Sequence, residues 1–449
     1  MVTLEQLYDI YRQYPDICTD SRRVRPGCLF WALRGERFDG NCFAAQALQS
    51  GAAYCVVDRA DAAPNSDKRL QVPDTLEALQ LLAAHHRRQL DIPVIAIGGS
   101  NGKTTTKELI AAVLNQQYTC CATQGNLNNH IGVPLTLLSI PQAAQIAVVE
   151  MGTNQPGDLE QLCAIAQPTH GLLTNIGKEH LEKLGSLQGV KKAEAELFDY
   201  LARRDGCAFI NLSERHLRSL ARSVKKKVFY AEVSPSKPLP KNVLGVERLP
   251  ANPFVRAQFT CSPEWQIQVQ THLLGHHNFH NVMTAIAVGL YFKVSPTSIK
   301  TAIESYRPAN NRSQLLSWES NTIFLDAYNA NPTSMRAALS VLQEAEAKHK
   351  VAILGDMLEL GEAAEVEHRA LIRLVERSDF QKVVFVGPLF SKYRPKRSRA
   401  LFFDNVALAR TWWEQQRFEH AFILIKASRG IGLEQLLEGQ LGETLQGAH

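Results

Sequence analysis

The sequence lacks the cysteine spacing of a disulfide framework or of a zinc site. The nine cysteines of the 449-residue chain stand at positions 18, 28, 42, 55, 120, 121, 163, 207 and 261. None of them forms a C-x-x-C pair, and a disulfide-stapled domain is much shorter and denser in cysteine. We therefore expect reduced thiols and a cytoplasmic protein.

Long hydrophobic runs, low-complexity segments and internal repeats are also lacking. The longest strongly apolar run, residues 282–292, falls short of the roughly 20 residues that a membrane helix needs. The first residues, MVTLEQLYDIYRQYP, mix polar and apolar positions and contain no apolar stretch of a signal peptide. We expect a soluble protein without a membrane span.

A strong excess of one charge is absent too. The chain has 49 Lys and Arg against 44 Asp and Glu, a net charge of +5 that is spread along its length. A nucleic-acid binder is usually more basic, with its basic residues clustered. The basic segment KYRPKRSR at 392–399 is better explained as a surface loop, so we expect no nucleic-acid partner.

The apolar runs that are present predict an α/β protein of three domains, in line with about 150 residues per domain. Residues 1–85 form a small N-terminal α/β unit, 86–309 a central doubly wound parallel sheet with a P-loop, and 310–449 a C-terminal Rossmann-like α/β domain of alternating strands and helices. The polar segment AAHHRRQLDIP at 83–93 separates the first two units. It fits either a solvated helix end or a linker.

The strongest single signal is GGSNGKTTT at 98–106, which directly follows the strand-like PVIAI and opens a helix-like segment. Amides of such a loop and of the helix start can converge on phosphate oxygens. Lys103 would neutralise phosphate charge and Thr104 would offer an oxygen to Mg²⁺. Ile97 stands where a strict Walker A sequence has glycine, so the loop is a shortened nucleotide-binding variant.

Two further residues are expected at the same sheet edge. Glu150 ends the strand-like IAVVE, and His180 follows the strand-like GLLTNIG. A carboxylate at the carboxyl end of a parallel strand can hold a metal beside the loop. Taken alone, Glu150 fits a structural role equally well, and a lone histidine such as His180 is more often structural than a ligand.

Five segments together resemble those of the Mur ligase family, whose members are ATP-dependent amide-forming enzymes of peptidoglycan precursor synthesis. They are GSNGKTT at 99–105, EMGTNQPGDL at 150–159, HNFHN at 277–281, DAYNANPTSM at 326–335 and LGDMLELG at 354–361. The form YNANP and the segment TDSRRVRPGCLFWALRGERFDGNCF at 19–43 resemble the family members that add D-alanyl-D-alanine.

The resemblance implies ATP and Mg²⁺ and assigns their sites. The implied ATP-binding residues are Gly99, Ser100, Asn101, Gly102, Lys103, Thr104, Thr105, Asn278, Asn281, Arg312, Asp326 and Asn331. The implied metal ligands are Thr104, Glu150 and His180, and Lys103, Glu150 and His180 are the implied catalytic residues. Asn and Asp are also common at helix caps and turns, so Asn331 before Pro332 fits a cap as well as a site.

The resemblance also implies two small-molecule substrates, UDP-MurNAc-tripeptide and D-Ala-D-Ala. The residues implied at the UDP end are Thr19, Asp20, Ser21, Arg22, Gly35, Asp39, Gly40 and Asn41. Arg22 suits a diphosphate. Those implied near the acceptor are Lys426, Ser428 and Arg429. A single chain carries all of these segments, and we expect a monomer.

One position departs from the family pattern. Related ligases carry a carbamylated lysine near their metal, and Glu194 stands at the matching position of GVKKAEAELF. Glutamate is already anionic and can do part of the same electrostatic work. Alternatively, Lys191 carries a carbamate about one helical turn earlier, or Glu194 is a solvated helix residue and the metal is held differently.

The implied reaction is amide formation through an acyl phosphate, with ADP and phosphate as products. Within the same class, the alternatives are another amino-acid-adding Mur ligase or a folylpolyglutamate synthase. From another class, a nucleotide-gated switch protein that hydrolyses ATP without ligation accounts for the P-loop but not for the first-domain segments.

Overall fold

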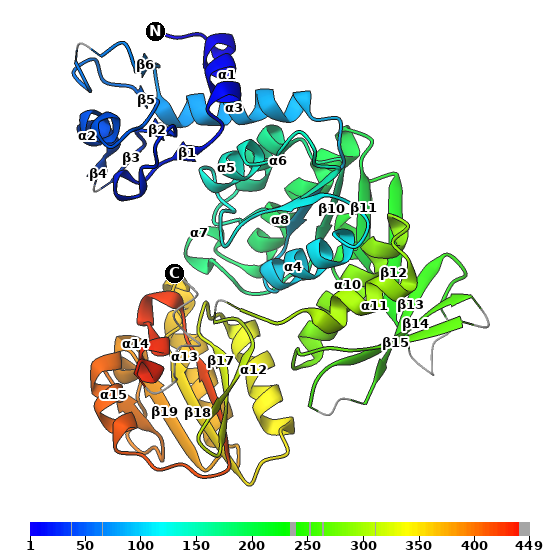
Figure 1. Ribbon diagram of the computed structural model, residues 1–449. Coiled ribbons are helices and arrows are strands. Elements are labelled where there is room, and N and C mark those ends of the chain that lie inside the picture. Colours follow the sequence, from blue (N-terminus) through cyan, green and yellow to red (C-terminus); the bar gives the residue numbers. More distant parts are fainter. Residues whose placement is uncertain are drawn as a thin grey trace.

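The computed structural model describes residues 1–439, except 37, 65, 234–238, 251–252, 263–264 and 310. Three sheets follow one another along the chain, each with its own helices (Figure 1). The expected α/β class with three sheet-containing parts is confirmed. None of the helices in these ranges is long and apolar enough to cross a membrane.

The first sheet has four parallel strands in the order β1-β2-β5-β6. Its strands are β1 (Ile17–Cys18), β2 (Leu29–Trp31), β5 (Tyr54–Val57) and β6 (Arg69–Gln71). The surrounding elements are α1 (Leu4–Gln13), α2 (Ala44–Gln49), α3 (Thr75–Gln89), the 3₁₀ turns Ser21–Arg23 and Gly40–Phe43, and the ribbon β3 (Arg34–Gly35) and β4 (Phe38–Asp39).

Helix α3 joins the first sheet to the central one. At its start, Thr75 accepts a hydrogen bond from the Trp31 indole at its carbonyl and donates its hydroxyl to the Ala32 carbonyl. At its end, the buried Arg87 guanidinium donates to the Ala166 carbonyl at 3.0 Å. Of the two interpretations of 83–93, a solvated helix end is wrong for Arg87 and its neighbour His86, because both are enclosed by the protein.

The central sheet has nine strands in the order β15-β14-β13-β12-β11-β10-β7-β9-β8. They are β7 (Val94–Gly98), β8 (Cys120–Ala122), β9 (Ile146–Glu150), β10 (His170–Leu173), β11 (Cys207–Asn211), β12 (Lys226–Glu232), β13 (Val243–Leu249), β14 (Arg256–Ser262) and β15 (Trp265–Gln270). The helices are α4 (Lys103–Leu114), α5 (Gly132–Leu138), α6 (Asp158–Ala166), α7 (Leu181–Leu184), α8 (Leu187–Arg203), α9 (Leu217–Leu220), α10 (His276–Tyr291) and α11 (Pro296–Ser305).

Strand β7 explains why helices cover both faces of this sheet. All five of its residues are buried, and alternate side chains of a strand point to opposite faces. Val94 and Ala96 join the core that contains α5, α6 and α8, whereas Ile95 and Ile97 join the core that contains α4 and α10. The doubly wound arrangement expected from the sequence is confirmed.

The edge beyond β13 differs from the expected all-parallel sheet. Strands β13, β14 and β15 pair antiparallel, whereas β8 to β13 pair parallel. The segment RAQFTCS of β14 alternates polar and apolar residues, and short connections join β13 to β14 and β14 to β15. Short loops suit antiparallel hairpins, since a parallel crossover needs a dozen or more residues.

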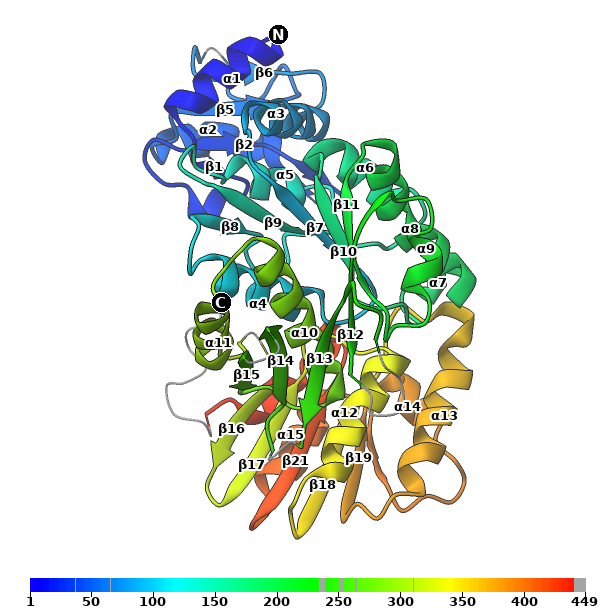
Figure 2. The same ribbon diagram turned by 90° about the vertical axis from the view of Figure 1, so that its right-hand side faces the viewer.

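The last sheet has six strands in the order β16-β17-β21-β18-β19-β20, with β16 antiparallel to its neighbour and the others parallel. The strands are β16 (Gln314–Trp318), β17 (Asn321–Asp326), β18 (His349–Gly355), β19 (Lys382–Val386), β20 (Leu401–Phe403) and β21 (Ala421–Lys426). The helices are α12 (Pro332–Glu344), α13 (Ala364–Glu376), α14 (Pro388–Lys392) and α15 (Val406–Glu414), with 3₁₀ turns at Gly361–Ala363, Arg429–Ile431 and Leu433–Leu437. This part lies against the carboxyl edge of the central sheet (Figure 2).

Candidate active site

The loop between β7 and α4 packs so tightly that two of its positions require glycine. Gly99 has φ +108°, and a Cβ there would lie 2.3 Å from the Thr174 hydroxyl. Gly102 has φ +80°, and a Cβ there would lie 2.7 Å from the Asn281 side chain. The loop therefore keeps its backbone close to β10 and α10, with the first turn of α4 beginning at Lys103.

Lys103 is partly buried beside three glutamates. Its ammonium group donates to the Gly99 carbonyl at 2.5 Å and lies 3.8 Å from Glu179. Burial lowers the pKa of Lys103, but the charges of Glu179, Glu194 and Glu150 outweigh burial and leave its pKa above the ordinary value. The lysine thus stays a cation.

Glu150 ends β9 and faces the first turn of α4. Its Oε1 accepts hydrogen bonds from the Thr104 hydroxyl at 3.1 Å and from the Asn128 amide at 2.8 Å. Its Oε2 is buried and has no hydrogen-bond partner. An unpaired buried carboxylate oxygen is costly unless a cation reaches it, and Mg²⁺ prefers such hard oxygens. Thr104 and Glu150 therefore fit a magnesium ion.

Glu179, which the sequence reasoning missed, lies on the same side of the loop. It is 6% exposed, and its Oε1 also has no hydrogen-bond partner. The sequence could have indicated Glu179, because it directly precedes His180 in NIGKEH after strand β10. A second anionic group beside Lys103 increases the demand for a cation.

Glu194 is fully buried on α8 and accepts a hydrogen bond from the Gly99 amide at 2.8 Å. Burial, reinforced by the charge of Glu179, raises the pKa of Glu194 to about 8. The alternative of a solvated helix residue is therefore wrong. Lys191 lies one turn earlier, where its charge acts on His216.

His180 points toward the last sheet. Its backbone has φ +44°, and its Nδ1 lies 2.7 Å from the Glu359 carboxylate. The hydrogen bond from His180 holds the pKa of Glu359 below its usual range. Its other ring nitrogen, Nε2, lies 3.9 Å from Glu179, so the histidine stands between the two parts of the chain.

Asn278 and Asn281 lie on the first turns of α10 and are both buried. The Asn281 amide donates to the Asn278 side chain at 2.9 Å, and the Thr106 hydroxyl donates to Asn281 at 3.1 Å. These bonds fix α10 against α4 and place both asparagines next to the loop.

Strand ends of the last sheet supply an opposing wall. The buried Lys426 ammonium group lies 2.5 Å from Asp326 and donates to the Asn329 carbonyl at 3.0 Å. Although burial acts in the opposite direction, Lys426 keeps the pKa of Asp326 below its usual range. Arg312 lies over the Tyr328 ring at 3.5 Å, so its planar cation is held flat beside this pair.

The two walls enclose one cavity of about 760 Å³. The predicted residues that line it are Ser100, Asn101, Gly102, Lys103, Thr104, Thr105, Glu150, His180, Asn278, Asn281, Arg312, Asp326, Asn331 and Lys426. Asn331 caps α12 through Ser334 and also contacts Asn101, so it serves as both cap and lining residue. A volume of this size suits a nucleotide.

Gly99 lies in the loop and Glu194 contacts its amide, but neither residue lines the cavity. Ser428 accepts from the Leu358 amide at 3.0 Å and donates to the Ala330 carbonyl, which makes it a brace between loops of the last sheet. Arg429 is exposed and lies 5.3 Å from the centre of the Tyr328 ring. Lys426 thus lines the cavity, whereas Ser428 and Arg429 lie outside its lining.

The residues predicted for the UDP end form a separate group on the first sheet. Asp20 caps the turn Ser21–Arg23 and binds the exposed Arg22 at 2.7 Å. Asp39 caps the turn Gly40–Phe43 and accepts from Asn41 at 2.7 Å. Thr19 and Gly35 lie in the same part of the chain. The described lining of the cavity begins at Ser100, so none of these residues reaches it.

Comparisons with known proteins match each of the three parts. The Mur ligase family catalytic domain matches residues 14–87, the Mur ligase middle domain 97–289, and the Mur ligase glutamate ligase domain 311–428. A Bacillus subtilis protein named UDP-N-acetylmuramoyl-tripeptide--D-alanyl-D-alanine ligase is 34% identical over 442 residues, which cover 94% of this chain and 92% of the relative.

Solved structures agree with these matches. MurF from Acinetobacter baumannii superposes with a TM-score of 0.84 at 30% identity, covering 97% of each chain. MurF ligase from Thermotoga maritima, solved in complex with ADP, has a TM-score of 0.80 at 25% identity and covers 96% of this chain and 97% of its own. Because the matches run through all three parts in the same order, the chain belongs to the Mur ligase family.

Proposed function

We propose that the chain joins D-alanyl-D-alanine to UDP-MurNAc-tripeptide at the expense of ATP, a step of peptidoglycan precursor synthesis. The observation that carries this proposal is Lys103, which is partly buried beside Glu150, Glu179 and Glu194 at the carboxyl edge of the central sheet and lines the cavity that faces the last sheet. The substrate names come from the full-length relative in Bacillus subtilis.

ATP binds in the cavity with its phosphates at the loop 99–105. The loop and the first turn of α4 offer backbone amides, and Lys103 offers a positive charge. Mg²⁺ would be held by Thr104 and Glu150, with Glu179 and His180 close by, and would neutralise phosphate charge. Asn278, Asn281, Arg312, Asp326 and Asn331 surround the rest of the nucleotide.

The reaction needs no nucleophile from the protein. The terminal carboxylate of the tripeptide attacks the γ-phosphorus of ATP, the bond to the β-phosphate oxygen breaks, and ADP leaves. The amine of the dipeptide then attacks the acyl carbon, phosphate leaves with the acyl oxygen, and the nitrogen loses a proton. Lys103 stabilises the transferred phosphoryl group, since fixed charges lower such barriers most effectively in a water-poor site.

We assign the UDP-sugar to residues 1–85, ATP to residues 86–309, and the domain that closes on the nucleotide to residues 310–449. Thr19, Asp20, Ser21, Arg22, Gly35, Asp39, Gly40 and Asn41 would hold the UDP end, and the region around Lys426, Ser428 and Arg429 the acceptor. We propose a monomer as the working unit, and we place it in the cytoplasm, where ATP is available.

The test is phosphate release from ATP by the purified protein, measured with each substrate omitted in turn. Release should require UDP-MurNAc-tripeptide, D-Ala-D-Ala and Mg²⁺ together, and mass spectrometry should find the pentapeptide product. A panel of glutamate, diaminopimelate and D-Ala-D-Ala as acceptors separates the proposed reaction from those of other amino-acid ligases. Phosphate release that proceeds equally without the dipeptide would rule out the ligase and favour the switch protein.

A further inference from the structure

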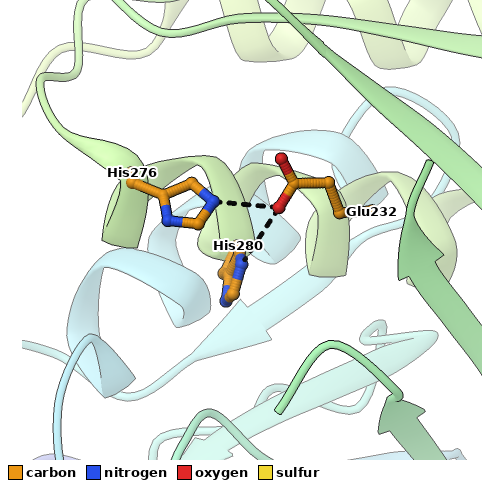
Figure 3. A group of neighbouring side chains, drawn as sticks. All are labelled: Glu232, His276 and His280. Carbon is orange, nitrogen blue, oxygen red and sulfur yellow. Dashed lines mark hydrogen bonds and ion pairs between the residues drawn. The ribbon is translucent and has the colours of Figure 1, made fainter. Parts of the chain in front are cut away.

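Two histidines of helix α10 and a glutamate of a neighbouring strand meet at one point. His276 and His280 lie four residues apart on this helix, and Glu232 ends the neighbouring strand β12. Residues four apart on a helix share one face. Figure 3 shows both imidazoles directed at the same carboxylate oxygen.

The spacing of the three groups suits a small metal ion. His276 Nε2 lies 2.9 Å and His280 Nε2 3.8 Å from Glu232 Oε2, and one ligand atom from each of the three residues lies within 4.8 Å of the others. Two ligands bound about 2.1 Å from a tetrahedral zinc ion lie roughly 3.4 Å apart. The observed distances bracket that value, so small side-chain movements complete the geometry.

The protonation states of His280 and Glu232 also suit metal binding. Burial lowers the pKa of His280 to about 4, so its imidazole is neutral at physiological pH. Its Nε2 is buried without a hydrogen-bond partner. Hydrogen bonds from His276 and Arg248 keep the pKa of Glu232 below its usual value despite burial, so this group is a carboxylate.

Arg248 is the main opposing charge. Its Nε donates to Glu232 Oε1 at 3.1 Å, which leaves Oε2 as the oxygen that faces both histidines. The cation would therefore be bound by Oε2 alone, with Arg248 orienting the carboxylate from behind. Such a second partner on a metal-binding carboxylate is common in metal sites.

We propose that Glu232, His276 and His280 bind a divalent transition-metal ion of the zinc class, with water as the fourth ligand. Two imidazoles and one carboxylate favour zinc-like ions over Mg²⁺, which prefers oxygen ligands. The ion would tie strand β12 to helix α10. Because His276 and His280 also line the nucleotide cavity whereas Glu232 does not, the bound water would face the cavity.

The experiment measures Zn²⁺ binding by the full-length protein after treatment with a chelator, in excess Mg²⁺ to occupy the other metal site. A chromophoric competitor should report one equivalent of tightly bound Zn²⁺. His280→Ala and Glu232→Gln should weaken binding by at least about 100-fold, since losing even an outer-shell partner costs about 10–100-fold. His180→Ala and the control His272→Ala should keep it.

A second readout separates ligand loss from misfolding. Co²⁺ in a site with two nitrogens and one oxygen should give visible absorption in the wild type, and far-ultraviolet circular dichroism should be the same in every variant. Zn²⁺ should also raise the unfolding temperature of the wild type but not of Glu232→Gln. Equal Zn²⁺ affinity in the wild type and His280→Ala, loss of binding in His180→Ala, or no binding by the wild type would each overturn the proposal.

Discussion

The Asn331 side chain donates a hydrogen bond to the Asn101 side chain at 2.8 Å, although 230 positions separate the two residues. Asn101 lies in the loop between β7 and α4, and Asn331 caps α12 of the last sheet. This bond closes the cavity at the place proposed for the ATP phosphates.

Replacing Asn331 with aspartate should weaken this closure. Aspartate can still cap α12 through its oxygen but cannot donate to Asn101, so we expect the KM for ATP to rise by about five- to tenfold, the value of one hydrogen bond. Ser334→Ala removes the other half of the capping box and serves as the control. Equal KM values for ATP in Asn331→Asp and the wild type would contradict this role.

Lys103→Ala should lower the rate of ligation by about 10²–10³-fold, the usual loss when one stabilising group is removed from a reacting charge. Steady-state kinetics of product formation checks this, with circular dichroism to show that the fold remains. Lys103→Arg should recover little activity, because a planar guanidinium cannot reproduce the contacts of the compact ammonium group with the Gly99 carbonyl and Glu179. Full activity of Lys103→Ala would remove the proposed role.

Glu179→Gln should raise the Mg²⁺ concentration needed for half-maximal activity, because one of the negative charges around Lys103 is lost. We expect a shift of about tenfold, the effect of a group next to the metal ligands. Glu182→Gln, at an exposed position three residues later, is the matched control. Chelation of Mg²⁺ should stop both variants and the wild type.

The residues of the loop could be predicted because their signal is local. A buried strand, a glycine turn and a helix follow one another at 94–114, and Glu150 ends a second buried strand. The bond between Asn101 and Asn331 could not be predicted in the same way, since nothing in either segment specifies the other. The antiparallel strands β14 and β15 could have been predicted, since RAQFTCS and WQIQVQ alternate polar and apolar residues as half-buried strands do.

The burial of Arg87 could not be predicted, because the sequence alone does not reveal which carbonyls surround a cation. Its guanidinium donates to the carbonyls of Ala166, Leu90 and Ile92 at 2.7–3.3 Å. Arg87→Ala should therefore lower the free energy of unfolding by about 2–4 kcal/mol, measured by urea denaturation. The exposed neighbour Arg88 is the control, where Arg88→Ala should change it by no more than about 0.5 kcal/mol.

His170 should make stability depend on pH. Burial, with a smaller contribution from Lys226, lowers its pKa from 6.5 to about 4. Between pH 6.5 and 4, His170 is protonated in the unfolded chain but neutral in the folded protein. Its contribution to the free energy of unfolding is therefore complete above pH 6.5 and falls as the pH drops toward 4. One proton accounts for up to about 1.4 kcal/mol per pH unit.

His170→Gln should retain a polar contact with Tyr291 and lose this titration. Urea denaturation between pH 7 and 5 should therefore give a shallower decline in the free energy of unfolding than in the wild type. Parallel declines would show that another group causes the acid sensitivity.

Helix α3 is anchored in the first sheet by Thr75 and in the central part by Arg87. An unbroken helix of 15 residues is a rigid rod about 22 Å long. The first and central parts should therefore rotate as one body, with a constant distance between the turn at Asp20 and the loop at Lys103. Opening and closing during turnover would then change only the position of the last sheet. The site for the sugar nucleotide would keep its place relative to the loop while the nucleoside triphosphate is exchanged.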